Sequence, residues 1–368
     1  MRKQKIAYIV SDIEKALAFE WIAQHLSSRY DLIFILIGKN ETPLIKFLNE
    51  QHIRLFVIPE HKNTFKKWLT ILSVLRKERP DIIHIHMWKA MILGLTASFL
   101  LGFKRRIFTR HYSVVHYIAD PRGLKWDKLC NWLATDIVAI SLNVRNVLIN
   151  KDKATPSKIH LINHGFDLAY FEFVDEKLVN ELRQKYNIPP GKGPVIGVIS
   201  RYLELKGIQY IIPAFQKLRE KYADAHLVLA NTHGDYENQI KKQLLALPRD
   251  SYIEIRFERE LAALYKLFTV FVHVPVDDNQ EAFGQTYVEA LAAGIPSVFS
   301  MSGVAPEFII DKVNALVVPH RNSDAIESAI TQILENPSLA NSLTTRGKIS
   351  VQNFTLETML SKLEELYA

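Results

Sequence analysis

The chain has 368 residues, of which 48% are hydrophobic and 23% are charged, and its formal net charge is +7. This composition excludes a disordered or collagen-like chain, and the length exceeds what one hydrophobic core usually serves, so we expect two globular domains. The one cysteine, Cys130, excludes an internal disulfide framework and suits a reducing compartment. The positive charge favours anionic partners, such as a nucleoside diphosphate or an anionic lipid surface. Nucleic acid is not expected, because the sequence lacks zinc-ligand spacings and basic–aromatic runs.

The beginning of the chain is basic and then apolar, as in a signal peptide. The apolar run ends at Val10, however, and Ser11 and Asp12 follow it, which favours a first β-strand. Residues 90–103 form the longest weakly polar run, but it is too short and too interrupted by Thr and Ser to span a bilayer. We therefore expect a buried helix there and a cytoplasmic protein.

Seven short apolar runs in the first half of the chain predict buried strands. They cover residues 5–10, 31–38, 53–59, 81–86, 106–111, 136–141 and 159–165. Helical patterns lie between most of them, as in residues 14–30 and 63–80. Alternating strands and helices are typical of a doubly wound parallel sheet, so residues 1–168 are predicted to form a Rossmann-like α/β domain.

Residues 61–77 read as a basic amphipathic helix that carries Phe65 and Trp68. Such a helix either rests on an anionic membrane or packs as an ordinary surface helix. The sequence leaves both interpretations open.

The alternating pattern pauses over residues 169–194, which end in a Pro/Gly cluster and are predicted to be a linker. Six further strand-like runs follow, at residues 195–200, 225–231, 252–257, 269–274, 296–300 and 315–319. They predict a second Rossmann-like domain over residues 195–350. We expect the two α/β domains to face a central cleft, since open α/β sheets bind ligands outside the carboxyl ends of their strands.

A stretch of the second domain places two glutamates around the start of a predicted helix. Glu281 lies in the loop before this helix and Glu289 lies more than one turn inside it. Backbone N–H groups of Phe283, Gly284 and Gln285 at the helix start would form an anion site, with Gly284 leaving room for a phosphate. The glutamates could then accept hydrogen bonds from hydroxyl groups on either side. The alternative is that both are ordinary surface glutamates.

A second signal follows the strand at residues 195–200. Arg201 and Lys206 lie in the loop, and Gly207 opens the next helix. A guanidinium and an ammonium at a strand's carboxyl end can neutralise a diphosphate without a metal ion. The alternative is a solvated basic loop.

Several segments together resemble the retaining GT-B glycosyltransferases of family 4. They are "EAFGQTYVEALAAGIPSV" (281–298), "SRYLELKG" (200–207), "INHGFDLAYF" (162–171), "DIVAISLNVRNVL" (136–148) and "VAPEFIIDKVNALVVP" (304–319). The tail, residues 354–368, is similar to the family's last helix, which crosses back to the first domain. The resemblance implies a GT-B fold and covers nearly the whole chain.

The resemblance also assigns roles to individual residues. Glu281 would face the donor sugar near the reacting centre, and Glu289 would hold the ribose. Arg201 and Lys206 would hold the diphosphate. His111, directly after the fifth predicted strand, would contact the sugar or its phosphate near the reacting carbon.

The predicted acceptor pocket lies in the first domain. We expect His84 and His86, which alternate along one strand, to face opposite sides, with His86 lining this pocket and His84 in the core. The first loop, residues 10–19, has no glycine where the family's loop is often rich in it. We therefore expect the diphosphate to rest mainly on the second domain, with Ser11 and Asp12 near the acceptor.

These features predict a metal-independent retaining glycosyltransferase. Its co-substrate would be a nucleotide-diphosphate sugar, with no separate cofactor. Its acceptor would be a carbohydrate or lipid-linked hydroxyl group of a cell-surface glycan or glycolipid. If the enzyme is bound to a membrane, it would lie at the inner membrane face. Asp277 and Asp278 are interpreted as a solvated loop rather than a metal clamp, and residues 256–258 as the loop that contacts the nucleobase. A sugar-nucleotide epimerase and a non-catalytic sugar-nucleotide-binding partner protein are the alternatives.

Overall fold

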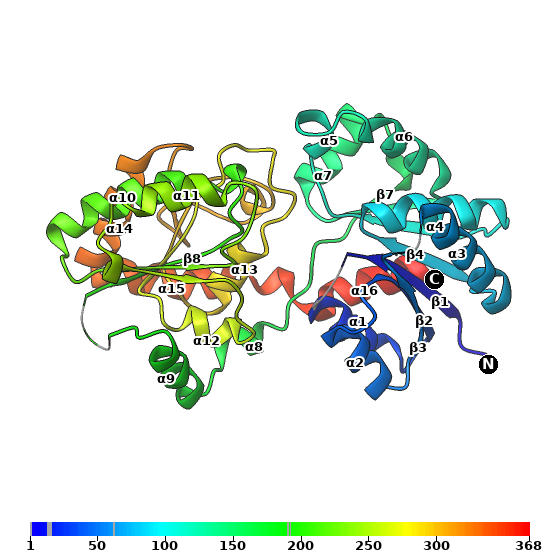
Figure 1. The fold of residues 1–368 in the computed structure, drawn as a ribbon, viewed down its shortest axis with the longest axis horizontal. Helices are drawn as coiled ribbons and strands as arrows, with labels where there is room; N and C mark the ends of the chain where they lie inside the picture. Colours follow the sequence, from blue (N-terminus) through cyan, green and yellow to red (C-terminus); the bar gives the residue numbers. More distant parts are fainter. Residues whose placement is uncertain (1, 13–16, 62, 190, 192) are drawn as a thin grey trace. The chain divides into compact units, whose positions relative to one another are not determined.

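The computed structural model describes residues 2–12, 17–61, 63–189, 191 and 193–368. The chain forms two compact units: Met1–Gly165 with Leu356–Ala368, and Phe166–Thr355 (Figure 1). We call them the first and the second domain. The last residues of the chain thus belong to the first domain, as the family resemblance implied.

A seven-stranded sheet with the order β3-β2-β1-β4-β5-β6-β7 forms the centre of the first domain, and all its pairings are parallel. The strands are β1 (Lys5–Ser11), β2 (Asp31–Gly38), β3 (Arg54–Pro59), β4 (Ile82–His86), β5 (Arg106–Arg110), β6 (Asp136–Ala139) and β7 (Ile159–Leu161). All seven predicted runs form strands. The seventh, predicted over residues 159–165, stops at Leu161, where it forms the edge of the sheet.

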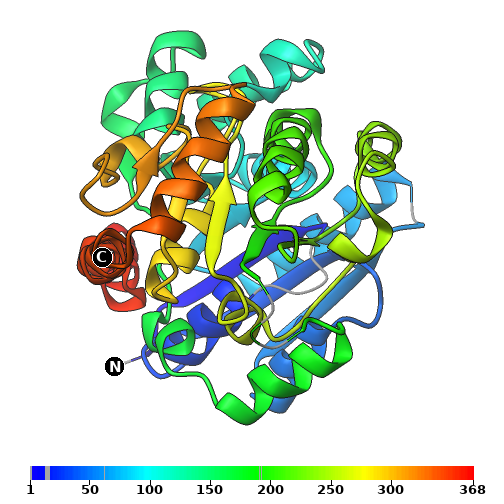
Figure 2. The same ribbon diagram turned by 90° about the vertical axis from the view of Figure 1, so that its left-hand side faces the viewer.

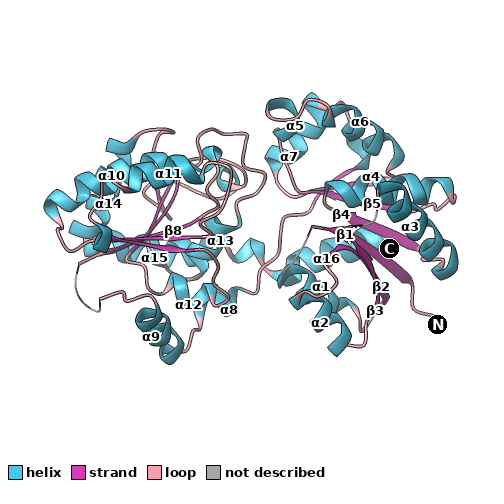
Figure 3. Ribbon diagram, viewed as in Figure 1, coloured by secondary structure: helices cyan, strands magenta, loops and turns pink. Residues whose placement is uncertain are grey.

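Helices cover both faces of this sheet (Figure 3). They are α1 (Leu17–Leu26), α2 (Pro43–Glu50), α3 (Thr64–Glu78), α4 (Trp88–Leu100), α5 (Val115–Ile118), α6 (Gly123–Leu133), α7 (Leu142–Asn146) and α16 (Leu356–Tyr367), with short turns at Val147–Lys151 and Pro156–Lys158. Helices α1, α2 and α16 share one hydrophobic core with the strands. On the other side α4 packs against α3, α6 and the central strands. The predicted helix at residues 14–30 begins in residues 13–16, which lie outside the described residues.

The second domain has a parallel six-stranded sheet with the order β10-β9-β8-β11-β12-β13. The strands are β8 (Val195–Ile199), β9 (His226–Ala230), β10 (Tyr252–Ile255), β11 (Val270–His273), β12 (Ser297–Phe299) and β13 (Leu316–Val317). Every one of them coincides with a predicted run. The fold class predicted from the sequence, two Rossmann-like domains, is confirmed.

The helices of the second domain are α8 (Leu168–Glu172), α9 (Glu176–Lys185), α10 (Ile208–Lys221), α11 (Glu237–Leu244), α12 (Leu261–Tyr265), α13 (Gln285–Ala292), α14 (Ser323–Glu335) and α15 (Pro337–Ser350). Short 3₁₀ turns occur at Glu204–Lys206, Arg249–Ser251, Ala305–Glu307 and Gln352–Phe354. Helices α10 and α14 pack side by side over the main core of this domain (Figure 2).

Residues 169–194, predicted as a linker, largely belong to the second domain. They include most of α8 and all of α9, and α8 packs against α12 and α13. Side-chain caps start both helices: Asp167 accepts from the Tyr170 N–H, and Asp175 accepts from the Lys177 N–H. The Pro/Gly cluster therefore ends a pair of capped helices, and the predicted linker is too long.

All strands of each sheet are parallel, but the order in which successive strands are placed reverses at the centre of the sheet. In the first domain β1 and β4 are neighbours, and in the second β8 and β11 are. The loops after neighbouring strands diverge to opposite faces there, which leaves room for a ligand at the carboxyl ends. Ser11, Asp12 and His86 lie at or beside this point in the first domain, and Arg201, Lys206 and Glu281 follow its strands in the second.

Helix α4 contains most of the apolar run at residues 90–103, and it is buried as predicted. Across the part of the chain that the structure describes, no helix combines the length and the apolar composition that a membrane span requires.

Gly207 provides a test of how closely the loop after β8 packs against the backbone that follows β11. It has φ +75°, and a Cβ atom there would lie 1.9 Å from the Val274 carbonyl oxygen. Gly102 has nearly the same φ, +74°, but nothing lies near its Cβ position. We expect Gly102→Ala to cost about 1–2 kcal/mol of unfolding free energy, from backbone strain alone, and Gly207→Ala to cost clearly more. Denaturant unfolding of both variants measures this; equal losses would show that the contact with Val274 is unimportant.

Candidate functional site

Lys206 and Glu281 meet at the carboxyl end of the second sheet. The Lys206 Nζ lies 2.5 Å from the Glu281 Oε2, although the residues are 75 positions apart. The loop after β8 brings the lysine and the loop after β11 brings the glutamate, and the Val276 N–H also bonds the Leu205 carbonyl at 3.0 Å. The two predicted signals of the second domain therefore form one site.

The charge of Glu281 is stabilised within this site. Burial disfavours its ionised form, but the adjacent Lys206 ammonium outweighs burial and lowers the carboxyl pKa to about 2. His273 Nε2 is 3.7 Å from the Glu281 Oε2, too long for a hydrogen bond. Burial also lowers the pKa of His273, so its ring is neutral at physiological pH. The site thus holds one fixed carboxylate, one ammonium and one neutral imidazole.

Two glycines bring backbone close to Glu281. Gly284 is the N-cap of α13 at φ +83°, and a Cβ there would lie 2.6 Å from the Tyr287 ring and 3.2 Å from the Glu281 Cγ. A Cβ on Gly303, at φ +60°, would lie 2.9 Å from the same Cγ. The first N–H groups of a helix have no partner within it, so the start of α13 presents donors and the positive end of its dipole beside the carboxylate.

The structure refines the predicted set of N–H groups. Phe283 is buried and precedes α13, and its carbonyl accepts from the Val304 N–H at 2.9 Å. Gly284 is half-buried, whereas Gln285, the first residue of the helix, is exposed. Gly284 and Gln285 are thus better placed for an anion than Phe283.

Glu289 lies inside α13 and is buried. Its Oε2 accepts a hydrogen bond of 2.8 Å from the Tyr265 hydroxyl. Burial raises the pKa of Glu289 to about 7, and this hydrogen bond offsets only part of the effect. The carboxyl group is therefore half protonated near neutral pH, which no ordinary surface glutamate would be.

The remaining residues predicted in the second domain are less connected. Arg201 follows β8 and is exposed, and within the described ranges no hydrogen bond or ion pair engages its side chain. Asp277 accepts from the Asn279 and Gln280 N–H groups, and Asp278 Oδ1 lies 2.8 Å from His320 Nε2. The two aspartates therefore have partners within and beside their own loop.

The first domain places its predicted acceptor residues differently. Ser11 is buried, and its hydroxyl accepts from the Ala90 N–H at 3.2 Å, so it caps α4. Asp12 is exposed, with φ +58°, and pairs with Lys89 at 2.9 Å. Ser11 is thus bonded to the start of α4, whereas Asp12 faces the surface.

Four histidines converge near the carboxyl ends of β4, β5 and β7 in the first domain. His84, His86, His111 and His164 line one cavity of about 50 Å³. His84 is in the core, as expected, and its Nε2 lies 2.8 Å from the Thr109 hydroxyl. The expectation that it faces the opposite side from His86 is wrong, because residues two apart on a strand share a face, and the two rings lie 4.3 Å apart in this cavity. His86 Nδ1 lies 3.1 Å from His111 Nε2, and the His111 and His164 rings stack at 5.5 Å.

These histidines are neutral. Burial lowers the pKa of His164 to about 4 and that of His84 to about 3, and it lowers those of His86 and His111 well below the usual value. Where the chain is described, no group of three or more His, Cys, Asp or Glu side chains is arranged to hold a metal ion.

Sequence reasoning missed His273, Tyr265 and His164. His273 ends a strand directly before the loop that carries Glu281, which is a local signal. Tyr265 and His164 come from distant segments, and only the fold brings them to Glu289 and His111.

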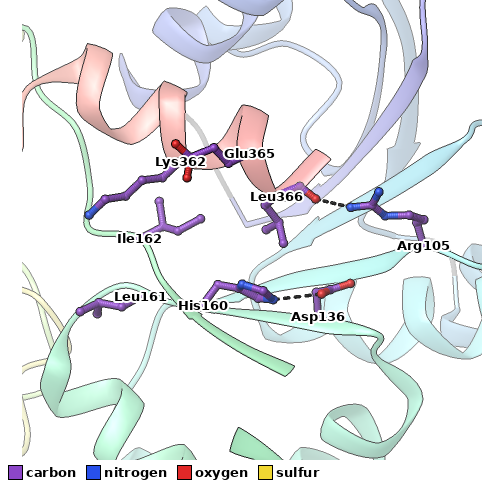
Figure 4. A pocket seen from close by; sticks show the side chains of 8 residues that line it. All are labelled: Arg105, Asp136, His160, Leu161, Ile162, Lys362, Glu365 and Leu366. Atoms are coloured by element: carbon purple, nitrogen blue, oxygen red, sulfur yellow. Dashed lines mark hydrogen bonds and ion pairs between the residues drawn. The ribbon is translucent and has the colours of Figure 1, made fainter. Parts of the chain in front are cut away.

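A larger hollow of about 420 Å³ lies at the β7 edge of the first sheet, beside α16 (Figure 4). Two contacts lie within it: Asp136 Oδ1 is 3.0 Å from His160 Nε2, and Arg105 donates to the Leu366 carbonyl. Its lining contains none of the residues predicted for the site.

Comparison with known proteins agrees with this geometry. Residues 179–350 match the family model described as glycosyl transferases group 1, and residues 22–170 match the model described as glycosyltransferase family 4. The chain belongs to the group 1 glycosyltransferases. The matched ranges include Lys206, Glu281, Glu289 and the four histidines.

Individual relatives have low sequence identity to this chain but align with most of its length. The capsular polysaccharide biosynthesis glycosyltransferase CapM of Staphylococcus aureus is 24% identical over 313 residues, which cover 82% of this chain and 80% of CapM. The alpha-monoglucosyldiacylglycerol synthase of Streptococcus pneumoniae is 27% identical over 274 residues, which cover 70% of this chain and 60% of the synthase. HepE of Anabaena, solved with UDP and glucose, has a TM-score of 0.85 at 19% identity over 98% of both chains. The last likeness establishes that this glycosyltransferase has the GT-B fold.

The raised pKa of Glu289 makes nucleotide binding pH-dependent if this residue holds the ribose. Two ribose hydroxyls need a carboxylate acceptor, so only the ionised form should bind well. Between one pH unit above and one below the pKa of about 7, the affinity of this glycosyltransferase for UDP or GDP should fall roughly tenfold.

Titration calorimetry at several pH values measures this affinity. The Glu289→Gln variant is the control, because the nucleotide's own phosphate also titrates near pH 6. It should bind more weakly and retain only the pH dependence due to the phosphate. An identical pH profile in both proteins would contradict the ribose role of Glu289.

Proposed function

We propose that this enzyme is a retaining glycosyltransferase that transfers a sugar from a nucleotide-diphosphate sugar to an acceptor hydroxyl. One observation supports this proposal above the others. The Lys206–Glu281 pair lies at the point of strand reversal of the second sheet, beside the amino end of α13. A cation, a fixed carboxylate and free helix N–H groups at one place suit a ligand with both phosphates and sugar hydroxyls.

Each residue of the second domain has a proposed role toward this donor. Lys206, Arg201 and the N–H groups of Gly284 and Gln285 bind the diphosphate. Glu281, ionised because of Lys206, accepts from hydroxyls of the transferred sugar. Glu289 binds the ribose. The exposed Phe257, in the loop after β10, offers a face on which the nucleobase can stack.

The chemistry follows from these charges. The bond between the sugar and the diphosphate breaks as positive charge develops on the sugar and negative charge on the departing phosphate. Lys206 and the dipole of α13 stabilise the phosphate, so no metal ion is required for that charge. The acceptor hydroxyl attacks from the face that the diphosphate leaves, which retains the configuration, and its proton passes to the departing phosphate oxygen. His111, in the first domain, contacts the sugar or its phosphate.

The acceptor is proposed to be a hydroxyl of a cell-surface polysaccharide or a glycolipid. CapM belongs by its name to capsular polysaccharide biosynthesis, and the Streptococcus pneumoniae relative makes a glycosylated diacylglycerol. Asp12, beside the strand reversal of the first sheet, and His86 are the proposed acceptor-side residues.

A sugar-nucleotide epimerase and a non-catalytic nucleotide-sugar-binding protein are less well supported. An epimerase needs acid and base groups beside the sugar, and the site of the second domain offers one carboxylate that stays ionised. A purely binding protein would not release the nucleoside diphosphate, so release discriminates between these functions.

Release of nucleoside diphosphate from a panel of nucleotide sugars tests the proposal. With the correct donor, Lys206→Ala and Arg201→Ala should each lower turnover roughly a hundredfold, because each removes a preorganised charge at the leaving group. Lys217→Ala, which removes an exposed lysine paired with Asp324, is the control and should leave turnover unchanged.

The same assay in excess EDTA tests metal independence, and activity should persist. Loss of activity that Mg²⁺ or Mn²⁺ restores would contradict the charge argument and direct attention to Asp277 and Asp278. Near wild-type turnover of both lysine and arginine variants at saturating donor would refute the diphosphate assignment.

We further propose that α3 contacts an anionic membrane. Its inner face buries Ile71, and Trp68 bonds Thr96 of α4 at 3.0 Å, so the helix is packed on the domain. Its outer face keeps Phe65 65% and Leu69 44% exposed, next to the exposed Lys66. Apolar side chains beside positive charge suit the surface of an anionic bilayer.

Sedimentation with vesicles tests this contact. The enzyme should bind vesicles that contain anionic lipid more than neutral ones, less so at high salt. Phe65→Ser with Leu69→Ser should weaken binding. Phe173→Ser with Leu245→Ser removes two apolar side chains of the second domain that are even more exposed, and it should not weaken binding. Equal loss in both double variants would contradict a specific role of α3.

A further inference from the structure

Three histidine rings from separate segments meet in the first domain. His86 ends β4, His111 directly follows β5, and His164 lies just beyond β7. His86 Nδ1 is 3.1 Å from His111 Nε2, which is hydrogen-bond distance. The rings of His111 and His164 are nearly parallel, with an angle of 16° between them, so His164 restricts the tilt of His111.

The hydrogen bond between His86 and His111 links the tautomers of both rings. Two neutral imidazoles can share such a bond in two ways, since one nitrogen must carry the hydrogen and the other must accept it. If His86 Nδ1 donates, then His111 has its hydrogen on Nδ1. If His111 Nε2 donates, then His86 has its hydrogen on Nε2.

The surroundings of His86 decide between these arrangements. Its Nε2 is buried and has no hydrogen-bond partner. Aromatic rings surround the imidazole: Tyr8 is stacked at 5.7 Å and Phe19 is perpendicular at 4.9 Å. A buried N–H group without an acceptor is rarer in proteins than an acceptor without a donor. The arrangement with a bare Nε2 is therefore favoured, and the hydrogen of His86 is on Nδ1.

We propose that His86 donates its Nδ1–H to His111 Nε2 and so holds His111 as the neutral Nδ1–H tautomer. His111 then offers an N–H donor, and not a base or a cation, to an oxygen atom of the bound sugar or phosphate. His86 is a positioning residue for this donor, and His164 supports the ring by stacking. The identity of the oxygen rests on the proposed function; the tautomer does not.

The electrostatics of the cluster agree with a neutral donor. Burial lowers the pKa of His111 well below its usual value, and His164 and His84 lower it further. Arg110, the neighbouring residue in the chain, directs its guanidinium to Asp127 and Asp152, both at 3.2 Å. His111 itself is half-buried, so part of its ring remains accessible.

The backbone after His86 shows that this position is held firmly. Met87 has φ 70° and ψ 150°, a conformation that is essentially restricted to glycine. It costs of order 1–3 kcal/mol and persists only where the surrounding structure imposes it. His86 therefore ends its strand immediately before a strained turn at the point of strand reversal.

Nitrogen NMR of the full-length enzyme labelled with ¹⁵N-histidine tests the tautomer without substrate. Two-bond proton–nitrogen spectra at neutral pH distinguish nitrogens that carry hydrogen from those that do not. We expect His86 and His111 each to have hydrogen on Nδ1. A His111 ring with hydrogen on Nε2, or on both nitrogens, would overturn the proposal.

Variants of His86 test the positioning role. His86→Phe keeps a ring but loses the donor, so His111 should lose its fixed tautomer and turnover should fall roughly tenfold, with little change in KM for the donor. His86→Asn keeps a hydrogen-bond donor, so it should restore part of the fixed tautomer of His111 and part of the turnover. His160→Phe, on the edge strand β7, alters a histidine that bonds Asp136 instead of the cluster; it is the control and should leave the His111 signals unchanged.

A His111 tautomer that is unaltered in a folded His86→Phe protein would overturn the positioning role. If no nucleotide sugar is turned over by the wild type, the proposed function fails, but the NMR result still decides the tautomer.

Discussion

The ion pair of Lys206 and Glu281 determines how the ligand-binding edge of the second domain is built. Their side chains are only 15% and 11% exposed, so each charge is tolerated there because the other lies 2.5 Å away. The pair joins the loop after β8 to the loop after β11, and Gly207 allows the first of these loops to run against the Val274 carbonyl. The amino ends of α10 and α13 are thereby held in one arrangement before any ligand binds, which is the preorganisation that electrostatic catalysis needs.

The first domain has the same strand reversal but different chemistry at it. Where the second domain concentrates charge, the first concentrates four neutral imidazoles around an apolar cavity. Neutral rings can orient hydroxyl groups, and because they carry no positive charge they do not compete with the second domain for the diphosphate. A division of this kind suits an enzyme whose two substrates differ as strongly in charge as a nucleotide sugar and a hydroxyl acceptor.

Much of this could be predicted from the sequence, because buried parallel strands leave short apolar runs and glycines mark loops that approach other backbone. Each of the thirteen strands in the described residues falls on a predicted run, with β1 extending one residue beyond it to Ser11, and Gly207 and Gly284 begin helices as predicted. What sequence patterns could not provide was pairing between distant segments. Lys206 and Glu281 were predicted to serve one ligand but not to bind each other, and Tyr265 was not connected with Glu289. Residues 169–194 were misjudged because the Pro/Gly cluster outweighed two helix caps, and the hydrogen bond of Ser11 with the backbone of α4 was not foreseen.

The path of the chain's last segment has a consequence for synthesis. Helix α16 completes the core of the first domain: the Tyr367 hydroxyl lies 2.7 Å from that of Tyr8 and 2.5 Å from His84 Nδ1. While a ribosome is still translating, the first 165 residues emerge and begin to collapse, but one of their covering helices does not yet exist. The second domain, continuous in sequence, can fold completely before the first can. The nascent protein must therefore keep an unfinished apolar face from aggregating until α16 has been synthesised.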